Sequence, residues 1–321
     1  RIIRTNDDGS EWLESKRPFH LGTKALHIDR KRGGLFVSEA KRLSCFDLDL
    51  NEKSEGGFPI GAATGRPGVN LGALDRAGNL YVSDLKQGSK SRGSEPGLHG
   101  VVKKFSPDGR LVQEDFCRTF LPDGGLAMDR SGCLYVSDTC RMGFMDAVHN
   151  WAIGRGVKWK RGKKVIRGQS DLAYLVKFPP GGGQRGTDAE LWAHRGVSPV
   201  MGGGCLCPIA TNCVAVDSAD RIFAADYVMY HAKVLDTAGN LIARIGNWGS
   251  ADCRGPKSKY PKPEIAFAWL HSMDTFGDAL YASDRDLRRI VKVRMGYREV
   301  KEATVPQLRE GMPWFQSWQI G

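Results

Sequence analysis

Histidine is the residue of this chain best suited to metal chemistry, and the sequence contains seven of them. Three neutral imidazoles around one opening can hold a metal and leave a coordination position for a substrate. The repeat described below places His27 and His271 beside the innermost strands, close to the central channel, and His231 on the face of the long loops, so the three are candidate ligands for a divalent metal, zinc or calcium. The alternative is that each histidine is simply hydrogen-bonded at a strand end.

Five of the eight cysteines fall in expected long loops. Three of them follow the spacing C-x-C-x₅-C, which lacks the paired C-x₂-C of a structural zinc site. Disulfides that hold glycine-rich loops together, typically worth about 2–4 kcal/mol each, are therefore favoured over thiolate–metal bonds. The disulfide candidates are Cys140, Cys205, Cys207, Cys213 and Cys253.

Positive charge is concentrated in a few segments. The 47 Lys and Arg exceed the 36 Asp and Glu, which gives a net charge of +11 and a pI near 9.3. Residues 141–170 alone carry eight Lys or Arg and one Asp. Aromatic rings beside cations suit anionic or glycan partners, although basic loops are often only solvated surface. The candidate binding residues are Trp151, Lys158, Trp159, Lys160, Arg161, Arg195, Tyr227, Tyr230 and Arg285.

Carboxylates recur at the ends of expected strands, as Asp84, Asp138, Asp226 and Asp284. A ring of carboxylates can be catalytic or can bind calcium, but a residue repeated in every unit is usually a structural hydrogen-bond partner. We therefore interpret these four as structural and assign no residue a catalytic role. The sequence contains no Gly-x-Ser-x-Gly, P-loop or His-Glu-x-x-His motif.

A sequence pattern that recurs along the chain predicts the strands that position these residues. Each copy consists of an apolar residue, an Asp, a turn that contains Gly, and the sequence Leu-Tyr-Val-Ser-Asp. The pattern is clearest at residues 74–84 and 128–138. The aspartates that open its turns are Asp29, Asp75, Asp129, Asp217 and Asp274.

Asp/Gly turns between short apolar runs predict hairpins, and four strands per unit at this period predict β-propeller blades. We expect an all-β, six-bladed propeller. Seven blades are the alternative, because the long gap after Asp129 could hold a further unit around residues 174–178 and 190–192.

Both ends of the chain are expected to share one blade. Residues 1–14 read as its third and fourth strands, and the tail at 313–320 could supply the first two. This predicts a single domain over residues 1–321 whose ring leaves no exposed strand edge. Because the chain begins with Arg1, we expect a processed chain or a piece of a longer protein.

Long insertions are expected on one face only. In an antiparallel meander, the loops between second and third strands and the loops between blades lie on the same side. The insertions in those two classes are residues 85–100, 139–173, 194–213 and 247–270, with 51–70 as a further loop. Binding sites are usually built on such a face.

The repeat resembles the NHL-repeat family of propellers in Leu126-Ala127-Met128-Asp129 and in Arg289-Ile290-Val291-Lys292-Val293. The last unit, with Trp269-Leu270-His271-Ser272 and Asp284-Arg285, is similar to a blade of the peptidyl-hydroxyglycine amidating lyases. That resemblance implies a zinc ligand at His271. The matching positions Leu26, Gly72, Leu126 and Val214 cannot bind metal, so the rest of the ligand set has no counterpart in register.

The sequence therefore predicts an extracytoplasmic, secreted or periplasmic, NHL-type propeller that binds a protein, glycan or other anionic partner through its basic loops. The alternative is a metal-dependent lyase or hydrolase at the mouth of the central channel. Nucleic acid fits the charge but not the cysteine-rich loops. No apolar run approaches the roughly 18 residues of a membrane span.

Overall fold

The repeated Asp-x-x-Gly turns form in the computed structural model as the sequence predicts. The structure describes residues 3–5, 12–14, 16, 25–29, 33–38, 42–53, 58–59, 70–85, 100–119, 122, 125–139, 160–161, 164–165, 173–195, 197, 213–226, 229–249, 253, 258–259 and 263–296.

Three consecutive turns share one hydrogen-bond pattern. The Oδ1 atoms of Asp75, Asp129 and Asp217 each accept the backbone N–H of the residue four positions later, at 2.8 to 2.9 Å. The hydroxyls of Tyr81 and Tyr135 donate to Oδ2 of Asp75 and Asp129, at 3.1 and 2.8 Å. A short polar side chain that satisfies the turn backbone in this way fixes the reversal between two strands.

Asp274 departs from this pattern. It lies inside a longer strand and is exposed, and its Oδ1 accepts the N–H of the next residue, Thr275. Gly277 stands at the same offset from its aspartate as Gly78 and Gly132, but Phe276 pairs with Ala279, so the fifth repeat makes a tighter turn of two residues.

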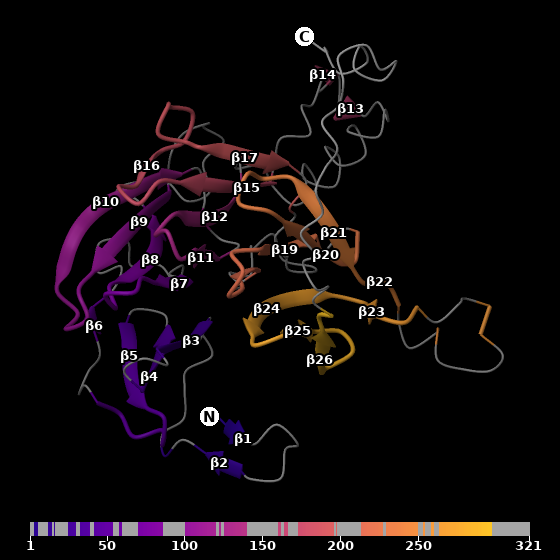
Figure 1. Cartoon of the computed structure of the whole chain (residues 1–321), viewed down its shortest axis with the longest axis horizontal. Coiled ribbons are helices and arrows are strands. Elements are labelled where there is room, and N and C mark those ends of the chain that lie inside the picture. Colours follow the sequence, from indigo (N-terminus) through magenta and orange to yellow (C-terminus); the bar gives the residue numbers. More distant parts are fainter. Residues whose placement is uncertain are drawn as a thin grey trace, which may run out of the picture.

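These hairpins extend into antiparallel blades, five of which fall within the described ranges (Figure 1). Blade one comprises β3 (Ala25–Asp29), β4 (Gly34–Ser38), β5 (Arg42–Asp47) and β6 (Phe58–Pro59). Blade two comprises β7 (Asn70–Leu74), β8 (Leu80–Leu85), β9 (Gly100–Phe105) and β10 (Leu111–Thr119). Blade three comprises β11 (Leu126–Met128), β12 (Leu134–Thr139), β15 (Ala173–Phe178) and β17 (Trp192–Arg195).

Blade four comprises β18 (Val214–Val216), β19 (Ile222–Asp226), β20 (His231–Leu235) and β21 (Leu241–Ile245). Blade five has three described strands, β24 (Leu270–Phe276), β25 (Ala279–Asp284) and β26 (Arg289–Arg294). Three short pairs lie outside these blades: β1 (Ile3–Thr5) with β2 (Trp12–Glu14), β13 (Lys160–Arg161) with β14 (Lys164–Val165), and β22 (Asn247–Trp248) with β23 (Ala266–Phe267).

One strand crosses between blades. β16 (Gly183–Gln184) lies in the excursion between β15 and β17 of blade three, yet it pairs in parallel with β10, the outer strand of blade two. Arg185 follows it and pairs with Asp138 at 3.2 Å and with Glu190. This fifth strand of blade two was not predicted from the sequence.

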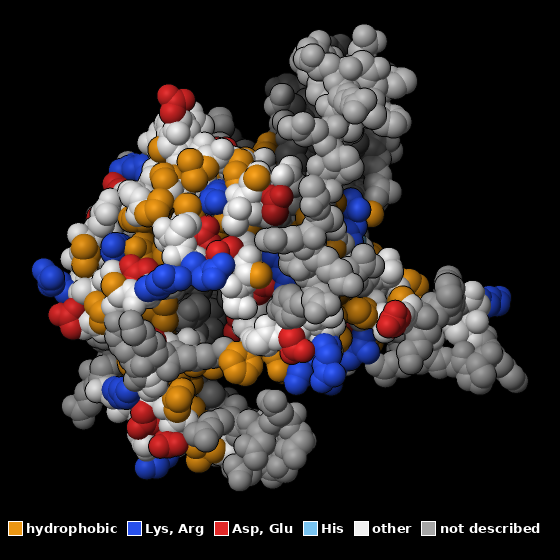
Figure 2. Space-filling model, viewed as in Figure 1, with side chains coloured by type: hydrophobic (Ala, Val, Ile, Leu, Met, Phe, Trp, Pro, Cys, Tyr) orange, Lys and Arg blue, Asp and Glu red, His pale blue; other side chains and the backbone are white. Residues whose placement is uncertain are grey.

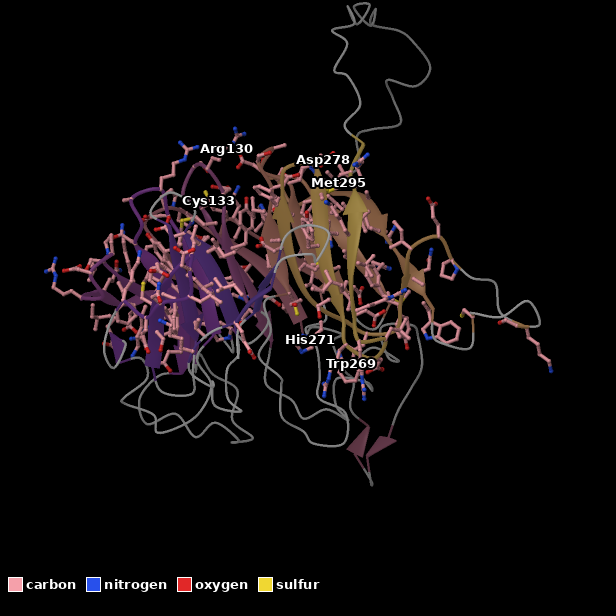
Figure 3. All side chains as sticks on the ribbon, turned by 90° about the horizontal axis from the view of Figure 1, so that it is seen from below. Arg130, Cys133, Trp269, His271, Asp278 and Met295 are labelled. Atoms are coloured by element: carbon pink, nitrogen blue, oxygen red, sulfur yellow. The ribbon has the colours of Figure 1, made fainter. Side chains whose placement is uncertain are left out.

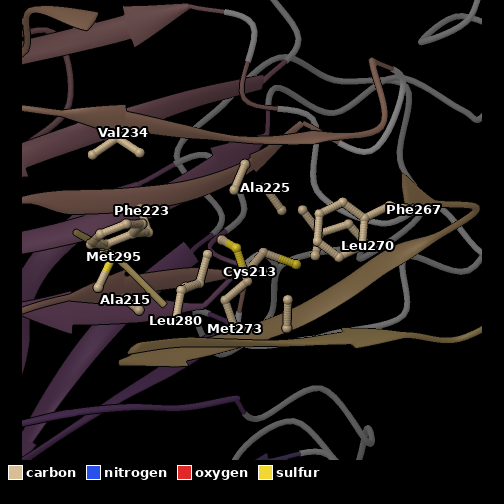
Figure 4. Packing of buried hydrophobic residues seen from close by; sticks show 12 residues of the cluster. Cys213, Ala215, Phe223, Ala225, Val234, Phe267, Leu270, Met273, Leu280 and Met295 are labelled. Carbon is tan, nitrogen blue, oxygen red and sulfur yellow. The ribbon is translucent and has the colours of Figure 1, made fainter. Parts of the chain in front are cut away.

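Apolar side chains between neighbouring blades form the core. Around the axis, β3 packs against β7, β7 against β11, β11 against β18 and β18 against β24. Figure 4 shows the cluster between blades four and five, where Phe223 and Val234 face Leu280 and Met295. Neighbouring blades therefore share apolar surface from blade one through to blade five.

Polar contacts reinforce the seam between blades three and four. Lys177 Nζ and Trp192 Nε1 both donate to the carbonyl of Thr237, at 2.8 and 3.0 Å. His194 Nδ1 lies 3.2 Å from the carbonyl of Gly239. Three side chains of blade three therefore hold the last turn of blade four.

The blade count differs from the expectation. The described residues contain five blades rather than six or seven. Residues 174–178 and 192, assigned to a possible seventh unit, lie in β15 and β17 and complete blade three. The insertion at 139–173 separates β12 from β15 and β17 of the same blade. In the sequence, β15 and β17 therefore resemble a separate unit. Likewise β6 lies inside residues 51–70, which were expected to be loop.

Two faces follow from the antiparallel order. The turn face carries the first-to-second and third-to-fourth strand turns, and the loop face carries the strand ends from which the four insertions leave. Figure 3 shows Arg130, Cys133 and Asp278 at the turn face, and Trp269 and His271 at the opposite end. In the ranges described above, no helix is long and apolar enough to cross a membrane.

We predict that Asp129→Ala destabilises the fold by about 2–4 kcal/mol, because it leaves the buried Tyr135 hydroxyl and the Cys133 N–H without an acceptor. The control is Asp236→Ala, whose Oδ1 accepts Ala238 and Asn240 N–H groups in a solvent-accessible turn. It should cost clearly less than Asp129→Ala, since water replaces the carboxylate. Urea unfolding measures both, and equal costs would contradict the role of burial.

Candidate functional site

The candidate site lies where the inner strand of blade five begins, on the loop face. β24 pairs with β25, with Leu270 opposite Asp284, and the register then shifts so that Ser272 faces Ser283. His271 is the extra residue of this bulge. β-Bulges re-aim side chains and are frequent beside functional sites. Blade two has an equivalent shift between Leu71 and Ala73, but there the extra residue is Gly72.

The tight turn after β25 brings Arg285 beside this bulge. Its backbone N–H donates to the Trp269 carbonyl at 3.0 Å, which joins the two strand ends. The guanidinium carbon lies 4.8 Å from the centroid of the Trp269 ring. Figure 3 shows Trp269 and His271 together at this end of the blade. A cation stacked on an indole is held in one plane.

The Arg285 guanidinium is exposed and forms no ion pair with any described residue. The neighbouring carboxylate is already occupied, because Asp284 accepts the N–H groups of Ala268 and Trp269 at 3.1 and 3.0 Å. Asp284 also lies 3.5 Å from Arg289 Nη2. The donors of Arg285 therefore remain available to a ligand.

His271 is half-buried between these groups. Burial and the positive charge of Arg285 both lower its pKa. Because its folded-state pKa lies below the unfolded value of about 6.5, the neutral imidazole favours the folded chain. This contribution is complete above about pH 6.5 and is lost as the pH falls below it. The Cys213 thiol, which donates to the His271 carbonyl at 3.1 Å, holds the bulge backbone in place.

His231 lies in a different environment, inside blade four. It is 6% exposed, and its Nε2 lies 3.9 Å from Asp226 Oδ2. Lys233 Nζ lies 3.5 Å from the same oxygen. Burial raises the pKa of Asp226 and lowers those of His231 and Lys233. His231 is thus next to a buried carboxylate and a lysine of its own blade.

The interpretation of the strand-end aspartates as structural is supported by their surroundings. Each is buried, with an exposed fraction of 1 to 4%. Each lies within ion-pair distance of a cation, Lys103, Arg185, Lys233 or Arg289. Removing such a cation would leave a buried charge uncompensated. These carboxylates therefore stabilise the blades.

Among the described residues, no three His, Cys, Asp or Glu side chains lie close enough together to hold a metal. No described side chain therefore completes a metal site with His271 or with His231. The side chain of His27, in β3, lies outside what the structure describes. The zinc or calcium site stays a prediction.

The predicted binding residues are only partly described. Arg285 is at the site, whereas Tyr230 packs edge-on against Trp248, with ring centroids 6.4 Å apart. Lys160 and Arg161 form β13 and Arg195 ends β17, but their side chains are not described. The remaining members lie outside the described residues: Trp151, Lys158, Trp159 and Tyr227. The prediction missed Trp269, although its place two residues before His271 was a signal.

Two of the five disulfide candidates are described. Cys213 and Cys253 are buried, and both are thiols in the structure. Cys140, Cys205 and Cys207 lie outside the described residues. Cys117 is fully buried, and burial raises its pKa to about 12.

Comparison with known proteins shows a fold and no family. No family model matches the sequence, and neither does any curated protein sequence. A protein of unknown function from Bacteroides caccae aligns with a TM-score of 0.50 at 11% identity, over 90% of this chain and 84% of that one.

Two other solved structures resemble the chain more weakly. A gluconolactonase from Xanthomonas campestris gives a TM-score of 0.47 at 17% identity, over 88% of this chain and 75% of that one. A chain of a nidogen/laminin complex gives 0.45 at 13% identity, over 85% and 76%. At these identities the likeness concerns the fold alone.

We predict that Arg285→Gln raises the pKa of His271, because one of the two causes that lower it is removed. An NMR titration of the imidazole protons measures this shift. The matched control is Arg294→Gln at the other end of blade five, which should leave the His271 titration unchanged. An unaltered His271 pKa in the Arg285 variant would contradict the site geometry.

Alkylation in denaturant without reductant should modify Cys213 and Cys253, because both are thiols. Mass spectrometry of the peptides reads out each position. In the native state Cys117 should react slowly, since burial keeps it protonated. Protection of Cys213 or Cys253 that reductant removes would restore the disulfide assignment made from the sequence.

Proposed function

We propose that the chain is a propeller binding module that takes an anionic group of its partner at Arg285, on the loop face. The observation that carries this proposal is the exposed guanidinium stacked on Trp269, with no ion pair among the described residues. An unpaired, oriented arginine beside the axis of a propeller is an available binding group rather than a structural one.

The chemistry of the site favours a planar or tetrahedral oxyanion. A guanidinium presents N–H donors in a fixed fork that matches carboxylate, sulfate or phosphate. Stacking on Trp269 removes part of the side-chain freedom that binding would otherwise have to restrict. The imidazole of His271 is close enough to interact electrostatically with Arg285 and adds a polar group to the same site.

The insertions add a longer-range attraction. Residues 141–170 leave the fold from β12 and return at β15, whose ends lie on the loop face. Residues 86–94 and 254–263 contribute seven further Lys or Arg and no acid. Charge of one sign around a site raises the association rate of an oppositely charged partner. Figure 2 shows that the described Lys and Arg side chains are interspersed with acidic ones on the face it displays. Together the three segments carry fifteen Lys or Arg and one Asp, which exceeds the net charge of +11 of the whole chain, so the excess charge belongs to these segments.

We further propose that the ring closes as a six-bladed, NHL-type propeller. In the described residues, β24 and β3 do not pack together as the other inner strands do. The β1–β2 hairpin, with Ile3 opposite Glu14, agrees with the predicted third and fourth strands of a shared blade. In Figure 1 it lies at the outer side of the interval between blades five and one. Residues 313–320 are our candidates for the inner strands.

Two further proposals, an extracytoplasmic location and a metal-dependent activity, depend on groups that the structure does not describe. An extracytoplasmic location depends on pairing among Cys140, Cys205 and Cys207. The alternative function, a metal-dependent lyase or hydrolase, depends on the side chain of His27 joining His271. Neither is needed for anion binding at Arg285.

The test is binding of a heparin oligosaccharide, measured by titration calorimetry. Arg285→Gln should weaken binding about tenfold, because charge-assisted hydrogen bonds are typically worth about 1.5–3 kcal/mol and the site is exposed. Arg285→Lys should recover only part of the affinity. Arg110→Gln, an equal charge change on the turn face, should have little effect.

A second variant separates the site from the insertion. Neutralising Lys158, Lys160, Arg161, Lys163 and Lys164 together should weaken binding and reduce its salt dependence. Weaker binding in that variant, combined with unchanged binding in Arg285→Gln, would place the partner on the insertion and overturn the assignment of Arg285.

A further inference from the structure

A hollow lies on the turn face, opposite the Arg285 site. It has a volume of about 510 Å³ and is lined by the first turns of blades two, three and four. This volume is within the range of about 300–1,000 Å³ that small-molecule sites occupy. Nothing in the proposed function uses this face.

The floor of the hollow is apolar. Leu74, Met128 and Val216 line it, and each is the residue directly before a turn aspartate. All three are half-buried. In blade one the corresponding residue, Ile28, is 47% exposed. The repeat thus places an apolar side chain at the same point of each inner strand and leaves these side chains incompletely covered around the axis.

The carboxylates of the lining are already satisfied. Asp75 and Asp129 accept hydrogen bonds from their own turns and from Tyr81 and Tyr135. Asp217 accepts two backbone N–H groups and pairs with Arg221 at 2.6 Å. These three acids therefore face donors of their own blades and do not give the hollow a free negative charge.

The fourth acid, Asp220, holds an arginine at the rim. Its Oδ1 accepts the backbone N–H of Arg130 at 3.0 Å, and its Oδ2 accepts Arg130 Nε at 2.9 Å. These contacts join blades three and four. Because they use Nε, the Nη groups of Arg130 are left toward solvent, and its side chain is 58% exposed.

The backbone conformation of Asp220 is strained, so the contact between Asp220 and Arg130 is formed at a cost in conformational free energy. Asp220 has φ +57°, whereas the equivalent turns of blades two and three use Gly78 and Gly132 at φ +84° and +85°. A non-glycine residue in this region is strained and persists where the surroundings hold it. Glycine would form the turn without this strain, so the carboxylate of Asp220 serves to fix Arg130.

We infer that this hollow binds a small amphipathic organic anion, with its carboxylate on the Nη groups of Arg130 and its apolar chain on Leu74, Met128 and Val216. Arg130 is the binding residue, and Asp220 is a positioning residue. Arg76, whose side chain is exposed on the same rim, adds a second positive charge. Because apolar side chains lie next to an oriented cation, an alkyl chain that carries a carboxylate should bind more tightly than a neutral or cationic alkyl compound of equal length.

The experiment uses octanoate as the probe, with octanol and octylamine as chain-matched controls, in titration calorimetry on the whole chain. We expect one octanoate per chain with a Kd of about 1 mM or tighter. For a ligand of about ten non-hydrogen atoms, this corresponds to a binding free energy per atom that small ligands reach. Octanol and octylamine should bind at least tenfold more weakly. Equal binding of octylamine, or no octanoate binding up to about 10 mM, would overturn the inference.

Three variants assign the residues. Arg130→Gln should weaken octanoate binding about tenfold. Asp220→Gly removes the carboxylate and relieves the positive φ, so it should weaken octanoate binding about three- to tenfold with little change in melting temperature. Arg285→Gln, on the other face, should leave octanoate binding unchanged. Full octanoate affinity in the Arg130 variant would refute the assignment, whatever happens to heparin binding.

Discussion

The hydrogen bond that an aspartate carboxylate accepts from the backbone N–H four residues later is the contact on which the rest of the propeller depends. It fixes the reversal between the two inner strands in blades two, three and four. In Asp129, burial raises the carboxyl pKa, but hydrogen bonds from Ser131, Tyr135 and Cys133 outweigh it and leave the pKa lowered. The charged carboxylate is therefore favoured in the fold, and the inner hairpins of blades two, three and four stack with one shape.

Much of this architecture could be predicted because it is local. An Asp, a Gly and an alternating apolar run determine a hairpin within a dozen residues, and this sequence repeats them. What could not be predicted arises from pairing between distant segments. The bulge at His271 depends on how β24 registers against β25, and the strand β16 depends on an excursion of one blade reaching another.

The site was predictable to a similar degree. Arg285 and His271 were named from the sequence, and the structure brings them together through strand pairing. His231 lies beside Asp226 and Lys233 in blade four. These neighbours could not be predicted, because sequence spacing gives a strand position but not the direction of a side chain. The clamp of Asp220 on Arg130 joins residues ninety positions apart, so no local pattern could reveal it.

The parallel pairing of β16 with β10 imposes an order on folding during synthesis. The outer edge of blade two is completed by residues of the excursion from blade three, which leave the ribosome much later than β10 itself. At translation rates of about 5–20 residues per second, that edge stays open for several seconds. An open strand edge can pair with other chains, so the nascent protein passes through a period in which a chaperone would protect it from aggregation.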